Sequence, residues 1–160
     1  MRHNPQLLIE QRLVQNYQRY YRLAFSYVRN EQDALDAVQE GAYKAILNSG
    51  KLRKAECLDT WLYRIMVNEA LTILRKRDKE DSEETALATL TVQDRYEDTD
   101  LLRALDQLEP LDRTIVTLRY FEELKLNQIA EITQQPLSTV KSRLYRAMEK
   151  LRKNMAEEEM

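Results

Sequence analysis

An acidic segment divides this chain into two blocks, and it constrains the fold more than any other feature of the sequence. The eight residues that start at Asp78 read Asp-Lys-Glu-Asp-Ser-Glu-Glu-Thr and offer no apolar side chain for a core. Residues 78–100 carry a net charge of −7, whereas the block before them carries +5 and the block after them, up to residue 156, carries +3. A segment of this composition buries too little apolar surface to fold by itself. The sequence therefore predicts two small domains, over residues 1–77 and 99–156, joined by a flexible acidic linker over residues 78–98.

Both flanking blocks are patterned for helices. Only two glycines and three prolines interrupt the 160 residues, and apolar residues recur at intervals of three and four. The first block predicts four helices. Asn30, with the acidic Asp33 three residues later, is the expected N-cap of one of them, and Thr60 is the expected N-cap of a helix that runs to Arg77. The predicted fold class is all-α.

Several kinds of chemistry are not expected. The single Cys57 and the single His3 provide neither an internal disulfide nor a four-ligand zinc site, and no nucleophile stands beside a candidate base. We therefore predict no cofactor, no metal site, no catalytic residue and no small-molecule substrate. Charged residues interrupt the first twenty positions, so no signal segment is expected and the predicted location is the cytoplasm.

The helix expected over residues 33–46 carries an acidic stripe. Asp33, Asp36 and Glu40 lie outside its apolar face, and within the helix only Lys44 is placed to neutralise them. One interpretation is a solvated acidic face, with Asp33 serving the helix cap. The other is a docking surface for a basic partner, and the stripe alone does not decide between them.

The helix expected from Thr60 has an apolar half and a contrasting polar half. Aromatic, cationic and amide side chains recur on the polar half, a combination that suits single-stranded nucleic acid because rings stack on bases while cations track phosphates. The alternative is that the tryptophan is a core residue and the arginines are merely solvated. The residues concerned are Trp61, Arg64, Asn68, Thr72, Arg75, Lys76 and Arg77.

The second block predicts a helix-turn-helix. A short helix over residues 126–132 is followed by a polar turn and by a longer helix over residues 138–155, with Ser138 as its expected N-cap. The outer face of the longer helix is basic, and such side chains donate to guanine edges and hold phosphates in the major groove. The alternative is an ordinary helical hairpin with a basic face. The candidate DNA contacts are Lys141, Ser142, Arg143, Tyr145 and Arg146.

Three segments together resemble an extracytoplasmic-function (ECF, group 4) sigma factor of the sigma-70 family. They are Asp33-Ala-Leu-Asp-Ala-Val-Gln-Glu40, Thr60-Trp-Leu-Tyr-Arg-Ile-Met-Val-Asn68, and Gln128-Ile-Ala-Glu-Ile132 through Ser138-Thr-Val-Lys-Ser-Arg-Leu-Tyr-Arg-Ala147. The resemblance spans about residues 16–155, in the family's order and spacing. It implies a region 2-like helical bundle and a region 4-like helix-turn-helix. The implied function is a subunit that binds core RNA polymerase and directs promoter-specific initiation through minus-10 and minus-35 elements.

The resemblance also implies roles and partners. In the family, the acidic helix docks on the clamp coiled coil of the largest catalytic polymerase subunit, which assigns docking to Asp36, Gln39 and Glu40. It assigns opening of the minus-10 element and capture of a flipped nontemplate base to the loop before Trp61 and the helix after it. It assigns the minus-35 element to the second helix of the helix-turn-helix. The linker would thread the RNA exit region of the polymerase. An anti-sigma protein, often membrane-anchored, is implied as an inhibitor.

Two functions of other classes stay open from the residues alone. A conventional helix-turn-helix regulator would bind duplex DNA as a dimer and would need no polymerase. An all-helical adaptor would use its basic faces for protein contacts, and its binding to DNA would show no steep dependence on salt.

Overall fold

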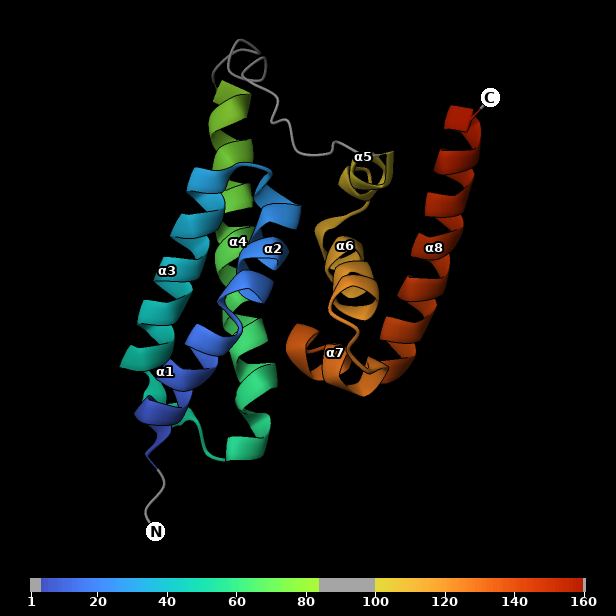
Figure 1. Cartoon of the computed structure of the whole chain (residues 1–160). Coiled ribbons are helices and arrows are strands. Elements are labelled where there is room, and N and C mark those ends of the chain that lie inside the picture. The colour runs from blue at the N-terminus through green and yellow to red at the C-terminus, as the bar shows by residue number, and fades with distance from the viewer. Residues whose placement is uncertain (1–3, 84–99, 160) are drawn as a thin grey trace. The chain divides into compact units, whose positions relative to one another are not determined.

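The computed structural model describes residues 4–83 and 100–159, which belong to two compact units (Figure 1). One unit is Met1–Glu83 and the other is Glu84–Met160. All regular secondary structure in the described residues is helical, which confirms the predicted all-α fold class. Residues 84–98 of the predicted linker lie outside the described residues.

Four helices form the first unit. They are α1 (Pro5–Gln15), α2 (Tyr17–Val28), α3 (Glu31–Leu47) and α4 (Leu58–Glu83). Helices α2, α3 and α4 pack against one another in all three pairings, and α1 packs against α3 (Figure 1). Two short 3-10 helices, η1 (Ser49–Lys51) and η2 (Ala55–Cys57), lie in the connection between α3 and α4.

The start of α3 follows the prediction closely. Arg29 ends α2 in the left-handed conformation, with a φ of 60°, and Asn30 is then the N-cap of α3. The side-chain oxygen of Asn30 accepts a hydrogen bond of 2.8 Å from the backbone N–H of Asp33. This contact satisfies one of the backbone donors that a helix N-terminus leaves unpaired.

Helix α4 begins and ends elsewhere than the sequence pattern indicated. It starts at Leu58, directly after η2, so the predicted N-cap role of Thr60 is wrong. The physical reason is that Leu58 is buried in the core, with 2% of its surface exposed, and enters the helix to reach it. At the other end α4 continues past Arg77 to Glu83. Residues 78–83 of the predicted linker are therefore helical. Lys79, Glu80 and Glu83 have good helix propensity, and adding residues to a helix that is already nucleated does not need apolar anchors.

The core of the first unit lies between α2, α3 and α4. Tyr20, Leu62 and Met66 are almost completely buried, and the rings of Tyr20 and Tyr63 meet edge to face with centroids 5.5 Å apart. Gly41 allows α3 to approach α4 closely, because a Cβ atom at this position would lie 2.6 Å from the sulfur of Met66. The close helix contact fixes the relative placement of the exposed faces of α3 and α4.

The second unit is built on one long helix. Its helices are α5 (Asp100–Asp106), α6 (Pro110–Val116), the π-helical turn η4 (Thr117–Phe121), α7 (Leu126–Thr133) and α8 (Leu137–Glu159). Helices α5, α6 and α7 all pack on α8. One hydrophobic cluster joins α5, α6 and α8; its buried members are Ala104, Leu105, Leu108, Val116, Ala147 and Leu151.

Helices α7 and α8 form the predicted helix-turn-helix. The turn contains Gln134 in the left-handed conformation, with a φ of 58°, and its backbone N–H donates to the carbonyl of Ala130. Helix α8 begins at Leu137, so Ser138 is its second residue and the predicted N-cap role of Ser138 is wrong. The carbonyl of Pro136, the residue directly before the helix, accepts a hydrogen bond of 3.0 Å from the N–H of Val140.

In the part of the chain that the structure covers, no helix combines the length and apolar character that crossing a membrane requires.

Candidate functional site

The predicted docking residues lie together on the outer face of α3. Asp36, Gln39 and Glu40 are all exposed, and Asp36 accepts a hydrogen bond of 3.0 Å from the side-chain amide of Gln32. They line a groove of about 680 Å³ between α3 and α4. The groove therefore carries acidic side chains on its α3 wall.

Lys44 does not neutralise this acidic wall by pairing with Glu40. Its ammonium group instead donates to Glu69 of α4, with the nitrogen and the carboxylate oxygen 2.8 Å apart. The hydrogen bond to Glu69 is the main reason that the pKa of Lys44 is raised, and the charge of Glu40 contributes least. Lys44 therefore pairs with α4 rather than with the acidic stripe of its own helix, and Asp36 and Glu40 face solvent.

Two large apolar side chains extend the acidic stripe, and the sequence interpretation missed them. Tyr43 is 61% exposed and Leu47 is 67% exposed, three and seven residues after Glu40 on the same helix. Residues at these spacings share a face. A helical wheel centred on Glu40, rather than on the apolar face, would have identified both.

The groove also brings two separately predicted sets of residues together. Lys76 and Arg77 of the predicted DNA-contacting set line it from α4, opposite Gln39 and Glu40 of α3. The two functions predicted for the first unit would therefore use neighbouring surfaces.

The predicted stripe on α4 is only partly exposed. Asn68, Thr72, Arg75 and Lys76 face solvent, whereas Trp61 and Arg64 are half-buried. The hydroxyl of Thr72 donates to the backbone carbonyl of Asn68 at 2.7 Å. The exposed surface is thus a shorter polar and cationic strip, flanked at its N-terminal end by a half-buried indole.

Arg77 has an internal role in the first unit. Its guanidinium donates to the carbonyl of Val28 at 2.6 Å and to the carboxylate of Asp33 at 3.3 Å. Val28 is the last residue of α2, where a positive charge is favourable for the helix dipole. Arg77 therefore ties α4 to the corner between α2 and α3.

Three exposed cations before α4 were not among the predicted site residues. Lys51, Arg53 and Lys54 lie in the connection from α3, and all face solvent. The resemblance assigned the loop before Trp61 to the minus-10 element but named none of these three residues, and their position a few residues before Trp61 was the available signal. Together with the exposed residues of α4, they give the first unit a cationic edge.

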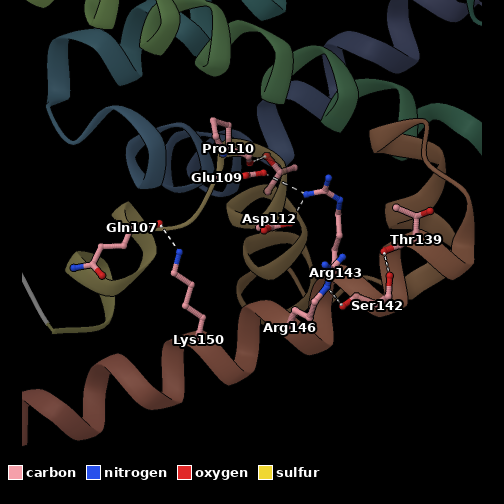
Figure 2. Close-up of polar contacts among 10 residues, drawn as sticks. Gln107, Glu109, Pro110, Asp112, Thr139, Ser142, Arg143, Arg146 and Lys150 are labelled. Carbon is pink, nitrogen blue, oxygen red and sulfur yellow. Dashed lines mark hydrogen bonds and ion pairs between the residues drawn. The ribbon is translucent and has the colours of Figure 1, made fainter.

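The basic face of α8 is present as predicted. Lys141, Ser142, Tyr145 and Arg146 are exposed, and Tyr145 is 70% exposed. The hydroxyl of Ser142 donates to the carbonyl of Thr139 at 3.2 Å, and Nε of Arg146 lies 3.5 Å from the carbonyl of Ser142 (Figure 2). These are weak contacts along the helix, so the side chains lie at its surface.

Arg143 differs from its neighbours on α8. Its guanidinium donates to Asp112 of α6 at 2.8 Å and lies 3.6 Å from a carboxylate oxygen of Glu109 (Figure 2). The hydrogen bond to Asp112 is the main reason that the pKa of Arg143 is raised. Farther along α8, Lys150 donates to the carbonyl of Gln107 at 3.2 Å. Both side chains therefore hold α8 against the preceding helices.

Nothing in the described ranges resembles a metal centre. No cluster of three or more histidine, cysteine or acidic side chains within residues 4–83 and 100–159 is arranged to hold a metal ion.

Comparison with known proteins matches both units. The family model of sigma-70 region 2 matches residues 13–80, and that of sigma-70 region 4 matches residues 98–151. Over 146 residues, the chain is 45% identical to RNA polymerase sigma factor SigV of Bacillus subtilis, covering 89% of this chain and 88% of SigV. Over 153 residues, it is 30% identical to ECF RNA polymerase sigma factor SigW of Bacillus subtilis, covering 84% and 82%.

A solved structure shares the fold. It is the co-crystal structure of the sigma factor RpoE in complex with the anti-sigma factor NepR from Bartonella quintana. The TM-score is 0.77 at 24% identity, and the match covers 92% of this chain and 96% of the compared chain. Because both region models match in order and one relative is 45% identical over nearly its whole length, the chain belongs to the extracytoplasmic-function sigma factors of the sigma-70 family.

Proposed function

We propose that the exposed face of α3 docks this sigma factor on the clamp coiled coil of core RNA polymerase. Asp36, Gln39 and Glu40 would make the polar contacts, with Tyr43 beside them. The observation that carries this proposal is the pairing of Lys44 with Glu69, because it leaves the acidic face turned toward a basic partner. Complementary charges steer such an encounter and favour the correct orientation.

The two DNA elements are divided between the units in this proposal. Asn68, Thr72, Arg75 and Lys76 contact the opened minus-10 strand, with the half-buried Trp61 and Arg64 beside them. Extracting a base from the stack costs a few kcal/mol, which stacking and phosphate contacts offset. Lys141, Ser142, Tyr145 and Arg146 contact the minus-35 duplex. Arg77 and Arg143 hold these surfaces in place through the internal bonds described above.

Partners and location follow from the same proposal. RpoE, which shares this fold, is bound by an anti-sigma factor, and we infer an anti-sigma partner for this chain too, of the soluble or membrane-anchored kind. The chain would act in the cytoplasm, where the polymerase is, and it would contribute no catalytic residue because the polymerase makes the phosphodiester bonds.

Run-off transcription with core polymerase, from the promoter upstream of the chain's own gene, tests the proposal. Glu40→Lys should lower the affinity for core polymerase and leave the helix-turn-helix intact. Arg146→Ala should weaken promoter use and leave core affinity unchanged.

Matched controls separate these effects from a general change of charge. Glu31→Lys makes the same charge change on α3, nine residues before Glu40 and therefore on the opposite face. Arg152→Ala removes an exposed arginine from α8 that pairs with Glu149 at 3.1 Å. Both controls should behave like the parent chain. Equal loss of core affinity in Glu40→Lys and Arg146→Ala would contradict the division of roles, and initiation that does not depend on the added chain would reject the function.

A further inference from the structure

Helix α1 contacts both ends of the cationic connection between α3 and α4. It packs against η1 at the beginning of this connection. At the other end, the guanidinium of Arg12 forms an ion pair with the carboxylate of Asp59, in the first turn of α4. Ile9 and Leu13 anchor α1 in the unit, since both are buried. Most of α1 precedes residues 13–80, the part of the chain that the region 2 family model matches.

The connection itself is built to present its charges. Leu52 and Leu58 are buried, with 7% and 2% of their surfaces exposed, and they pin the connection to the core. Lys51 directly precedes Leu52, and Arg53 and Lys54 directly follow it. All three side chains are exposed to solvent. A cationic segment that is fixed at its ends loses little conformational entropy when it binds a phosphate chain.

The charge of Asp59 makes Arg12 important for this arrangement. In the sequence, Asp59 lies between the three cations and Trp61, and its side chain is 50% exposed. Left unneutralised, its carboxylate would repel a phosphate backbone that passes from the cations to the indole. The Arg12 side chain is 32% exposed, and its guanidinium neutralises that charge while holding α1 to α4.

We propose that α1 is a positioning element that holds the cations of residues 51–54 in line with Trp61 for binding the opened DNA strand, and that Arg12 is its key residue. This inference rests on the proposed minus-10 role of the first unit. Arg12 does not touch DNA in this arrangement. It acts by fixing the connection and by masking Asp59.

The test uses the holoenzyme on a duplex promoter from upstream of the chain's own gene, with opening measured as permanganate reactivity of the minus-10 thymines. Arg12→Ala should lower opening up to about fivefold, which the constant of 1.36 kcal/mol per tenfold converts to about 1 kcal/mol, the upper range for an exposed ion pair. Arg12→Lys should restore most of the loss. Arg22→Ala, which removes an exposed cation from α2, controls for net charge.

Combining Arg12→Ala with substitutions at residues 51, 53, 54 and 59 distinguishes a positioning role of Arg12 from a general effect on the stability of the unit. In a chain with alanine at residues 51, 53 and 54, Arg12→Ala should cause no further loss of opening, because the cations it positions are gone. Asp59→Asn combined with Arg12→Ala should open better than Arg12→Ala alone, because no unmasked carboxylate remains. Affinity for core polymerase should not change in any of these variants.

Independent losses from Arg12→Ala and from the triple alanine variant would overturn the inference, as would a parallel fall in core affinity. If the triple variant opens the promoter normally while the parent chain still depends on Glu40, the proposed function stands and α1 has no positioning role. If the parent chain directs no initiation with core polymerase, the proposed function itself fails.

Discussion

Replacing Arg143 should lower the stability of the second unit, whereas replacing Lys141 should weaken its binding to DNA, although both residues were expected to contact DNA. The Arg143 side chain is 29% exposed, and it donates at 2.8 Å to Asp112, which is 22% exposed. A hydrogen bond to a charged group contributes about 1.5–3 kcal/mol when well buried, and partial exposure reduces this. We therefore expect Arg143→Ala to destabilise the second unit by about 1–2 kcal/mol. Lys141 is exposed, and Lys141→Ala should change stability by less than about 0.5 kcal/mol.

Hydrogen exchange of the full chain, followed by mass spectrometry, measures this difference unit by unit. In Arg143→Ala, slowly exchanging amides of α6 and α8 should lose protection by about 5- to 30-fold, which corresponds to 1–2 kcal/mol, and peptides of α2 to α4 should be unchanged.

Binding to duplex DNA over a range of salt concentrations completes the test. Lys141→Ala should lower the slope of log affinity against log salt by about 1, as expected for one lost phosphate contact, and Arg143→Ala should leave the slope unaltered. A slope change of that size in Arg143→Ala, with unchanged exchange in α6 and α8, would refute the structural role that we assign to Arg143.

Three further substitutions test the first unit. Gly41→Ala should destabilise it by up to about 2 kcal/mol in urea denaturation, because overpacking against Met66 costs about 1–3 kcal/mol and the gain in helix propensity returns about 1. Burial raises the pKa of Tyr20 to about 12 from 10.0, so its contribution to stability is complete below pH 10 and is lost toward pH 12. Tyr20→Phe should remove about 2–3 kcal/mol of that alkaline loss, as measured by denaturation at both pH values. Lys44→Ala should lower the thermal midpoint because it leaves the carboxylate of Glu69 buried without its cation, and adding Glu69→Gln should recover much of the midpoint.

The sequence predicted where helices occur more accurately than it predicted the residues at which they begin. Asn30 occupies the expected N-cap position, because its preference is local and nothing nearby opposes it. Thr60 and Ser138 were equally good local candidates, but α4 and α8 begin two and one residues earlier. At Thr60 the demand for burial of Leu58 decided the boundary, and such a demand belongs to the packed unit rather than to the cap residue.

The candidate sites were predictable as helix faces but not as individual side chains. Periodicity alone placed Asp36, Glu40 and Arg146 on outer faces, and the structure finds all three exposed. It could not separate Arg143 from Arg146, because the acidic partners of Arg143 come from α6, about thirty residues earlier. Which cation binds internally and which is left for a ligand depends on how helices pack, and periodicity within one helix carries no information about that.

The two units share one feature: an arginine within the helix proposed to contact DNA, α4 or α8, binds neighbouring helices and so orients its own helix. Arg77 binds the end of α2 and the start of α3, and Arg143 binds the start of α6. Each unit keeps other cations exposed beside it, Arg75 and Lys76 in the first and Lys141 and Arg146 in the second. In the second unit, Lys141 and Arg146 would provide two phosphate contacts, and two contacts give a salt slope of only about −2, which is weak binding at physiological salt. Promoter selection by such units therefore requires that both act in one chain, since the tether turns the second contact into an intramolecular step and multiplies two weak affinities.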